Sequence, residues 1–193
     1  RALAASDDAS PRLILTGAML AAVFGALATL LLTLTPEQRL RGAIFWLVGD
    51  LSGADHAGAS LAAALVFSLA LLARHRAIDR LLLGSEAAHL LGEPVRRLRL
   101  ELLVGASLAA GLAVASAGAI GFVGLVVPHA LRLAGVQRTR DLAWLTPFGG
   151  AALLMAADLL SRSVASPIEL PVGAVMALVG APVFVVFLAR GTR

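Results

Sequence analysis

Long charge-free runs alternate along the chain with short segments rich in arginine. The charge-free runs occupy residues 13–36, 57–73, 102–131, 142–157 and 170–189. Because about 20 apolar residues in a helix cross the hydrocarbon core of a bilayer, the runs predict membrane-spanning helices. The expected straight spans cover about residues 12–35, 58–73, 142–160 and 172–189. The pattern therefore predicts an all-α, polytopic membrane protein.

The run at 102–131 is too long for a single straight span. As one helix it would extend about 45 Å, whereas the hydrocarbon core is about 30 Å thick. It would also place the arginines before and after it on opposite sides of the membrane, which the positive-inside rule disfavours. We expect 102–116 to cross the membrane, a turn at Gly118 and Gly121, and a short return segment that ends at Arg132. The count is then six membrane segments, with the C-terminus inside.

The segment at 74–101 carries six arginines and four acidic residues. Its apolar positions are too few for a span, and Gly84 interrupts them. Ser85 is a favourable residue for capping a helix that starts there, and Gly92 and Pro94 are typical of a helix end. We expect two short amphipathic helices on the cytoplasmic surface, separated at Gly84.

Composition supports a membrane protein and excludes several chemistries. Hydrophobic residues make up 59% of the chain and charged residues 15%, against about 45–50% and about 25% in soluble domains. Without cysteine, the chain has no disulfide and no thiolate metal site. All 16 basic residues are arginine, so the lysine of a Walker-type phosphate loop is missing and ATP hydrolysis of that type is excluded.

The six-segment arrangement places 13 of the 16 arginines on the cytoplasmic side, as the positive-inside rule requires. Since these arginines lie between apolar spans, the net charge of +4 does not indicate a nucleic-acid partner. The first residues form no signal peptide because they contain no apolar stretch. With Arg1 in first place, we expect an N-terminally truncated chain.

Five segments together resemble the FecCD family, the permeases of binding-protein-dependent ABC importers for iron-siderophores, haem and cobalamin. They are "RGAIFWLVGDLSG" at 41–53, "LLLGSEAAHLLG" at 81–92, "GAIGFVGLVVPHALRL" at 118–133, "ADLLSR" at 157–162 and "ELPVGAVMALVGAPVFVVFLAR" at 169–190. The resemblance covers nearly the whole chain in the family's order. It implies a ten-helix permease fold, of which this chain would hold the last six segments as a single transmembrane permease domain, 1–193.

The resemblance also implies how such a protein works. It would be a transport subunit in the bacterial cytoplasmic (inner) membrane, not an enzyme, and would need no cofactor. The implied partners are a cytoplasmic ABC ATPase dimer, a periplasmic or lipid-anchored substrate-binding protein, a second permease subunit in a homodimer, and membrane lipid. ATP hydrolysis on the separate ATPase would drive inward movement of substrate by alternating access.

The resemblance assigns 74–101 as a cytoplasmic coupling segment that contacts the ATPase. Its coupling residues would be Gly84, Glu86, Ala87, Ala88 and Gly92, with the small alanines allowing close approach. An amphipathic loop that lies on the lipid surface is the alternative.

At the outer end of its span, Arg162 follows Asp158 by four residues. The resemblance implies that Arg162 meets acidic residues of the binding protein. A local ion pair with Asp158 is the alternative, and Glu169 could orient the following loop.

The remaining candidates are structural or pathway residues. They are Gly118, Gly121, Gly124, Pro128, His129, Pro171, Gly173, Gly180 and Pro182. Glycines three to four residues apart favour close helix packing. We expect Pro128 to end or kink the return segment and His129 to bond a freed carbonyl, although a histidine in a membrane segment also fits a proton relay or ligand role. No metal-ligand spacing is present.

Two other classes of function stay open. An ion-coupled secondary transporter usually carries intramembrane acids, and only Asp158 qualifies. An intramembrane hydrolase needs a paired motif such as His-Glu-x-x-His or a Ser-His dyad, and His129 has no evident serine partner.

Overall fold

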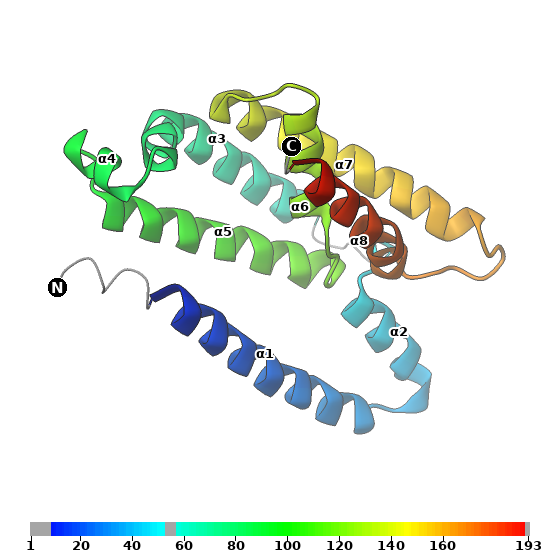
Figure 1. Ribbon diagram of the computed structural model, residues 1–193. Coiled ribbons are helices and arrows are strands. Elements are labelled where there is room, and N and C mark those ends of the chain that lie inside the picture. Colours follow the sequence, from blue (N-terminus) through cyan, green and yellow to red (C-terminus); the bar gives the residue numbers. More distant parts are fainter. Residues whose placement is uncertain (1–8, 53–56, 192–193) are drawn as a thin grey trace. The chain divides into compact units, whose positions relative to one another are not determined.

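The computed structural model describes residues 9–52 and 57–191, and this part of the chain is helical with no strand (Figure 1). Its helices are α1 (Ala9–Thr33), α2 (Glu37–Val48), α3 (Ala57–Leu82), α4 (Ser85–Leu90), α5 (Val95–Ala117), α6 (Val123–Leu133), α7 (Thr139–Ser163) and α8 (Val172–Gly191). Four of them are long and apolar enough to cross a membrane: α1, α3, α5 and α7. The helices α6 and α8 contain shorter apolar stretches, Val123–Leu133 and Val172–Phe187. The all-α, polytopic fold class is therefore confirmed.

The chain divides into two compact units, Arg1–Ile44 and Phe45–Arg193. In the first unit, the apolar stretch Ile14–Thr33 of α1 has no buried residue. Such a helix is stable in contact with lipid because its backbone hydrogen bonds are satisfied within the helix.

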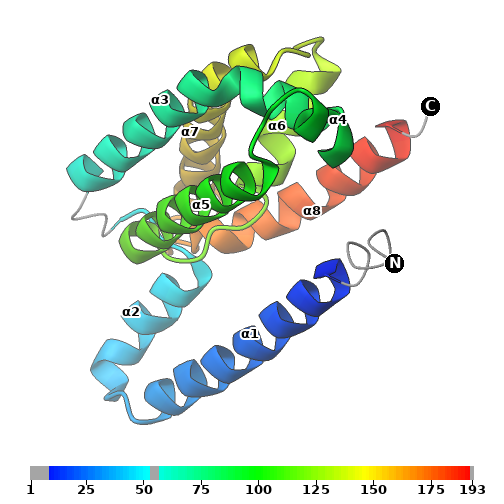
Figure 2. The same ribbon diagram turned by 90° about the vertical axis from the view of Figure 1, so that its left-hand side faces the viewer.

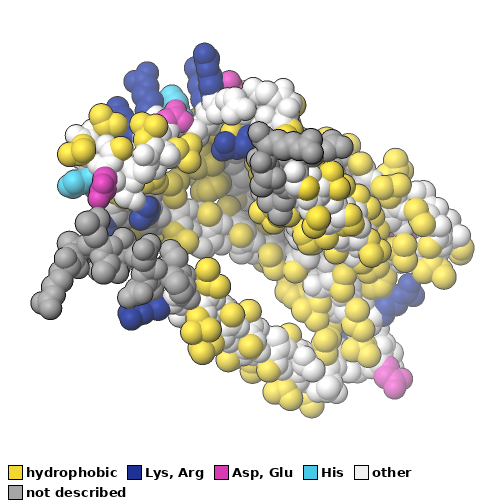
Figure 3. All heavy atoms as spheres, in the orientation of Figure 1, with side chains coloured by type: hydrophobic (Ala, Val, Ile, Leu, Met, Phe, Trp, Pro, Cys, Tyr) yellow, Lys and Arg dark blue, Asp and Glu magenta, His cyan; other side chains and the backbone are white. Residues whose placement is uncertain are grey.

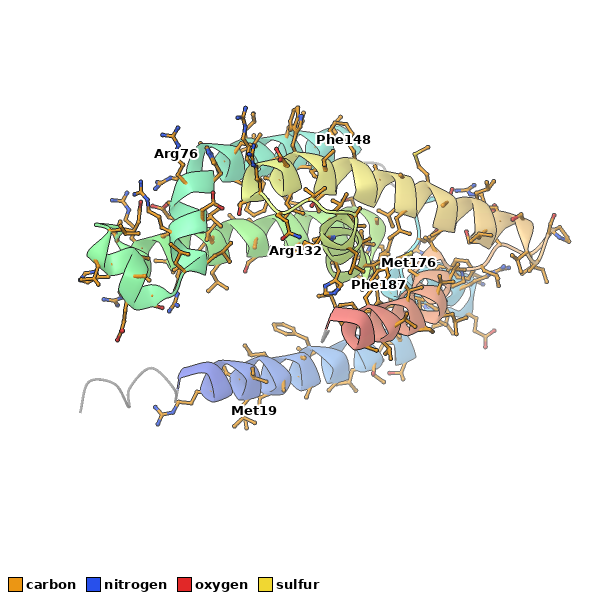
Figure 4. All side chains as sticks on the ribbon, turned by 45° about the horizontal axis from the view of Figure 1, so that its top comes forward. Met19, Arg76, Arg132, Phe148, Met176 and Phe187 are labelled. Atoms are coloured by element: carbon orange, nitrogen blue, oxygen red, sulfur yellow. The ribbon has the colours of Figure 1, made fainter. Side chains whose placement is uncertain are left out.

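In the second unit, α3 packs against α5 and α7, while α7 also packs against α6 and α8 (Figure 2). The buried core cluster joins Ala157 of α7 to Val172 and Met176 of α8; Met176 is labelled in Figure 4. Partly buried residues of the α5–α6 connection, including Ile120 and Phe122, pack on this cluster. The short α4 contacts α3 and α5 and lies at the end of the unit opposite the α7–α8 connection (Figure 1).

The segment 74–101 differs from its expected form. Instead of two separate amphipathic helices, α3 continues without a break to Leu82, and α5 already begins at Val95. No glycine or proline occurs between 59 and 82, so nothing stops the helix where charge begins. Only α4 and its two flanking turns lie outside the long helices.

The expected turn after 102–116 is confirmed, and Gly118 and Gly121 both lie in the connection between α5 and α6. α5 ends at Ala117, and Gly118 has φ +72°. The second residue with positive φ is Phe122, at +67°, and not Gly121. α6 then returns as an 11-residue helix.

Three glycines allow three backbone segments to meet at this turn, and we call the contact the glycine junction: Gly49, Gly118 and Gly173. A Cβ on Gly118 would lie 1.9 Å from the carbonyl oxygen of Trp46. One on Gly173 would lie 1.7 Å from that of Val48. Two hydrogen bonds close the junction: the Asp50 N–H donates to the Ala117 carbonyl (2.9 Å), and the Gly173 N–H donates to the Gly49 carbonyl (3.1 Å).

We predict that Gly173→Ala destabilises the protein by about 1–3 kcal/mol or more, as overpacking does, because backbone must move to admit the methyl group. Gly124→Ala is the matched control, since a Cβ there meets no atom within 4 Å and alanine favours the helix. Thermal unfolding in detergent, followed by tryptophan fluorescence, should show a lowered midpoint only for Gly173→Ala. Equal midpoints for the two variants would contradict the junction.

Candidate functional site

The turns on either side of α4 depend on two glycines with left-handed backbones. Gly84 has φ +108° and Gly92 has φ +83°. A Cβ at either position would meet no atom within 4 Å, so the backbone conformation, and not a lack of space, requires glycine here. These two turns separate α4 from α3 and α5 and let it stand as a distinct short helix.

One face of α4 is buried and the other is exposed. Ala88 is completely buried and Ala87 half-buried, whereas Glu86, His89 and Leu90 are exposed. Leu90 is 87% exposed, the highest exposed fraction among the large apolar side chains of the described residues. The burial of Ala88 corrects its sequence interpretation, since it packs inside this chain and cannot approach another. The outer surface of α4 consists of Glu86, His89 and Leu90.

Two side-chain contacts between distant residues hold α4 in place. Arg80 of α3 forms an ion pair with Glu93, whose side chain is only 15% exposed. Arg99 of α5 donates from Nη2 to Ser85 Oγ over 2.6 Å. Ser85 does not cap α4, because the cap position is Gly84 and has no side-chain hydrogen bond; this corrects the expected capping role. No local sequence rule pairs residues 13 or 14 positions apart, so sequence reasoning missed both contacts.

Arginine side chains gather at this end of the second unit (Figure 3), and they belong to the last part of α3, the first turns of α5 and the start of α7. Glu101 links two of them, accepting from Arg74 (3.0 Å) and from Arg97 (2.9 Å). The bridge ties the C-terminal third of α3 to the first turns of α5 beside α4. We refer to this region as the arginine-rich end.

At the opposite end of α7, Arg162 forms the expected ion pair with Asp158, with Nε 2.9 Å from Oδ2. Its guanidinium also donates to Ser52 Oγ (3.4 Å) and lies 3.9 Å from Glu169. The side chain is 45% exposed. Arg162 therefore joins α7, the segment after α2 and the α7–α8 connection, while one side of it still faces outward.

The predicted helix-packing role holds for some glycines and not for others. A Cβ on Gly180 would lie 2.7 Å from Phe122 Cβ, and Gly173 and Gly118 belong to the glycine junction. A Cβ on Gly121 or Gly124 would meet no atom within 4 Å. Within the described part of this chain, neither Gly121 nor Gly124 permits a close approach, and a packing role for them stays a prediction.

At Pro128 the expected helix end is not found, while a kink there stays a prediction, and the carbonyl bond expected for His129 is not found in the described ranges either. α6 does not end at Pro128 but continues to Leu133. The His129 ring stacks on Phe187 of α8, with centroids 5.8 Å apart, and meets Phe184 edge-on; Phe187 is labelled in Figure 4. Within the described residues the ring bonds no carbonyl, so His129 packs α6 against α8 instead.

Pro171 lies just before α8 and Pro182 lies within it. The carbonyl of Pro171 accepts from the N–H groups of Ala174 and Val175 and so starts the helix. α8 runs through Pro182 to Gly191 without a break. In the described part of the chain, no three His, Cys, Asp or Glu residues gather as a metal site would require.

The described residues thus present two candidate surfaces, the exposed short helix α4 at the arginine-rich end and Arg162 at the opposite end.

The FecCD transport family matches residues 2–190. The chain belongs to the FecCD transport family. A FecCD protein is a multi-pass membrane transport protein, in agreement with the four long apolar helices.

Individual relatives agree with the family. The hemin transport system permease protein HmuU of Yersinia pestis is 38% identical over 184 residues, which cover 93% of this chain and 54% of HmuU. The cobalamin import system permease protein BtuC of Halobacterium salinarum is 42% identical over 178 residues, 91% of this chain and 47% of BtuC. The chain spans about half the length of the curated relatives it matches.

A solved structure also resembles the fold. It is described as an inward-facing conformation of a metal-chelate type ABC transporter, with a TM-score of 0.80 and 30% sequence identity. The similarity covers 97% of this chain and 62% of that one. The helix arrangement is therefore that of an ABC transporter permease.

We predict that Glu93→Gln loosens α4, because it removes the ion pair with Arg80. Since Arg80 is 43% exposed, the pair is worth about 1 kcal/mol at most, and amide hydrogen exchange over 85–93 should quicken by up to about fivefold. The matched control is Glu86→Gln, because Glu86 has no ion-pair partner among the described residues. Hydrogen exchange followed by mass spectrometry measures both. Unchanged exchange in Glu93→Gln would contradict the bracing role.

Proposed function

We propose that this chain forms the transmembrane permease of a binding-protein-dependent ABC importer for an iron-siderophore, haem or cobalamin. The observation that carries the proposal is α4, a short helix held outside the long helices with an exposed outer surface. The hemin and cobalamin permeases among the relatives support this substrate class. The importer would lie in a bacterial cytoplasmic membrane with the arginine-rich end inside, as the positive-inside rule favours.

In this proposal α4 receives the motion of a cytoplasmic ATPase dimer. Glu86 and Leu90 offer a charge and an apolar side chain on the same exposed surface. Gly84 and Gly92 provide the turns, while Ala88 anchors the helix inside. Because Glu93 and Ser85 tie α4 to α3 and α5, a push on α4 would reach both long helices.

The opposite end would receive the substrate-binding protein. Arg162 is partly exposed, and its partners Asp158 and Ser52 hold it in position. The local ion pair and the docking role are therefore compatible, since one side of the guanidinium stays open to an acidic residue of the binding protein. Glu169 lies next to it and would repel a misplaced acid.

The proposed subunit works with a second copy. Several large apolar side chains of α8 are exposed, among them Leu178 at 78% and Val185 at 63%. A second permease subunit or lipid would cover them. Between two such subunits the pathway would open alternately to each side, with substrate delivered by the binding protein.

Neither alternative class gains support from the described residues. Asp158 is the single acid that lies within the spans expected from the sequence, and it is paired with Arg162. An acid that couples transport to an ion must instead be free to bind and release that ion. The His129 ring lies against Phe184 and Phe187, and no serine hydroxyl bonds it.

We predict that Glu86→Arg in the assembled importer abolishes association with its ATPase, because it reverses charge on the exposed face of α4. Glu169→Arg makes the same change at the opposite end and serves as the control. Co-purification of the ATPase with tagged permease, from cells that express both, measures the effect. Full retention of the ATPase by Glu86→Arg would exclude the coupling role of this residue.

For docking, we predict that Arg162→Glu lowers the stimulation of ATP hydrolysis by the binding protein about tenfold or more, because it places like charges opposite each other. Arg140→Glu, at the arginine-rich end, is the control and should keep the stimulation. The measurement is ATPase activity in proteoliposomes with and without binding protein. If both variants respond to the binding protein as the unmodified permease does, Arg162 is not a docking residue.

A further inference from the structure

A hollow of about 920 Å³ lies between α4 and the first turns of α5. Three arginines line it, Arg96, Arg97 and Arg99, together with Ser85, Glu86 and Leu100. The residues come from two helices joined by a turn, so the hollow has a shape fixed by the fold.

The charges that line the hollow do not balance. Arg97 pairs with Glu101, but neither Arg96 nor Arg99 has a carboxylate partner in the described ranges, 9–52 and 57–191. Arg99 donates to the neutral hydroxyl of Ser85. Glu86 alone opposes the three arginines along the lining, so the hollow attracts anions.

The start of α5 adds to this positive potential. Its first turn contains no acidic residue, although the positive end of a helix dipole favours acids there. An anion in the hollow would offset both the dipole and the two unpaired guanidinium groups. Arginine suits a phosphate in particular, because its planar group can donate two parallel hydrogen bonds.

Below the arginines, the same face of α5 is apolar and uncovered. Residues three, four and seven positions apart share a helix face, so Leu100 and Leu103 follow Arg96 and Arg99 down the span. Leu100 is 60% exposed and Leu103 61% exposed. A cationic group directly above an exposed apolar face of a spanning helix matches a lipid, with its phosphate above and its acyl chains below.

We propose that this hollow binds the phosphate group of an anionic phospholipid, held by Arg96 and Arg99. Basic pockets at the ends of transmembrane helices bind acidic lipid headgroups in this way. The lipid would neutralise the start of α5 and, through the bond from Arg99 to Ser85, fix α4 against α5. An acidic surface of a protein partner is less suited to the hollow, because the apolar face below the arginines continues into the span.

The test compares two double variants of the purified permease. Arg96→Gln/Arg99→Gln removes the two unpaired arginines, and Arg138→Gln/Arg140→Gln removes two arginines at the start of α7. Each protein is extracted from membranes that contain phosphatidylglycerol, and the retained lipid is measured by native mass spectrometry. We expect the first variant to retain about tenfold less phosphatidylglycerol, since each arginine contributes to binding an acidic surface, and the second to retain it fully.

Further arms separate the other possible occupants. Inorganic phosphate at millimolar concentration should not displace the lipid; displacement would show a site for the free ion and overturn the proposal. Equal loss in both double variants would show diffuse surface charge and overturn it as well. Unchanged lipid together with lost ATPase binding in the first variant would assign the hollow to a protein contact instead.

A single variant keeps the test valid if the first double variant does not fold. Leu100→Glu leaves every arginine in place but puts an acid in the hollow, so it should also lower phosphatidylglycerol retention. Leu108→Glu is its matched control further along α5, where the side chain is likewise exposed, at 64%. Equal retention by the two variants would overturn the proposal. Lipid retention itself is measured without ATP or an ATPase, so its failure is distinct from a failure of the proposed transport function.

Discussion

The close contact of backbone with backbone at the glycine junction is the constraint on which the second unit depends. Helices in lipid gain no hydrophobic free energy by meeting each other, so van der Waals contact and interhelical hydrogen bonds must hold them together. Gly49, Gly118 and Gly173 lack the side chains that would separate the segments. The hydrogen bonds donated by Asp50 and Gly173 then satisfy backbone groups that a turn would otherwise leave without partners.

The junction sets where the long helices begin and end, and so places the two candidate surfaces. α5 ends at Ala117, α6 packs against α7, and α8 starts beside the end of α2. α3, α5 and α7 connect this region to the arginine-rich end. Since packed helices move as rigid bodies more readily than they bend, a displacement of α4 would be carried along α3 and α5 toward the junction and Arg162.

Several ion pairs and side-chain hydrogen bonds near the helix ends fix short segments that lack a core of their own. Arg80 holds Glu93, Arg99 holds Ser85, and Arg162 holds Asp158 and Ser52. Each contact is modest by itself, because most of the arginines are partly exposed. Their importance is geometric, since six residues of α4 have little buried area to define their position.

The sequence by itself determined the helical spans, the reversal after 102–116 and the separation of arginine-rich from apolar segments. Those features follow from the short-range pattern, because bilayer thickness and charge exclude other arrangements. Only the tertiary structure showed that α3 runs on to Leu82, that Phe122 has a left-handed backbone in the turn, and that Ala88 is buried. It alone distinguished Gly173, which admits a neighbouring backbone, from Gly124, which faces open space. The sequence alone does not distinguish these glycines, because the role of each depends on which distant segment packs against it.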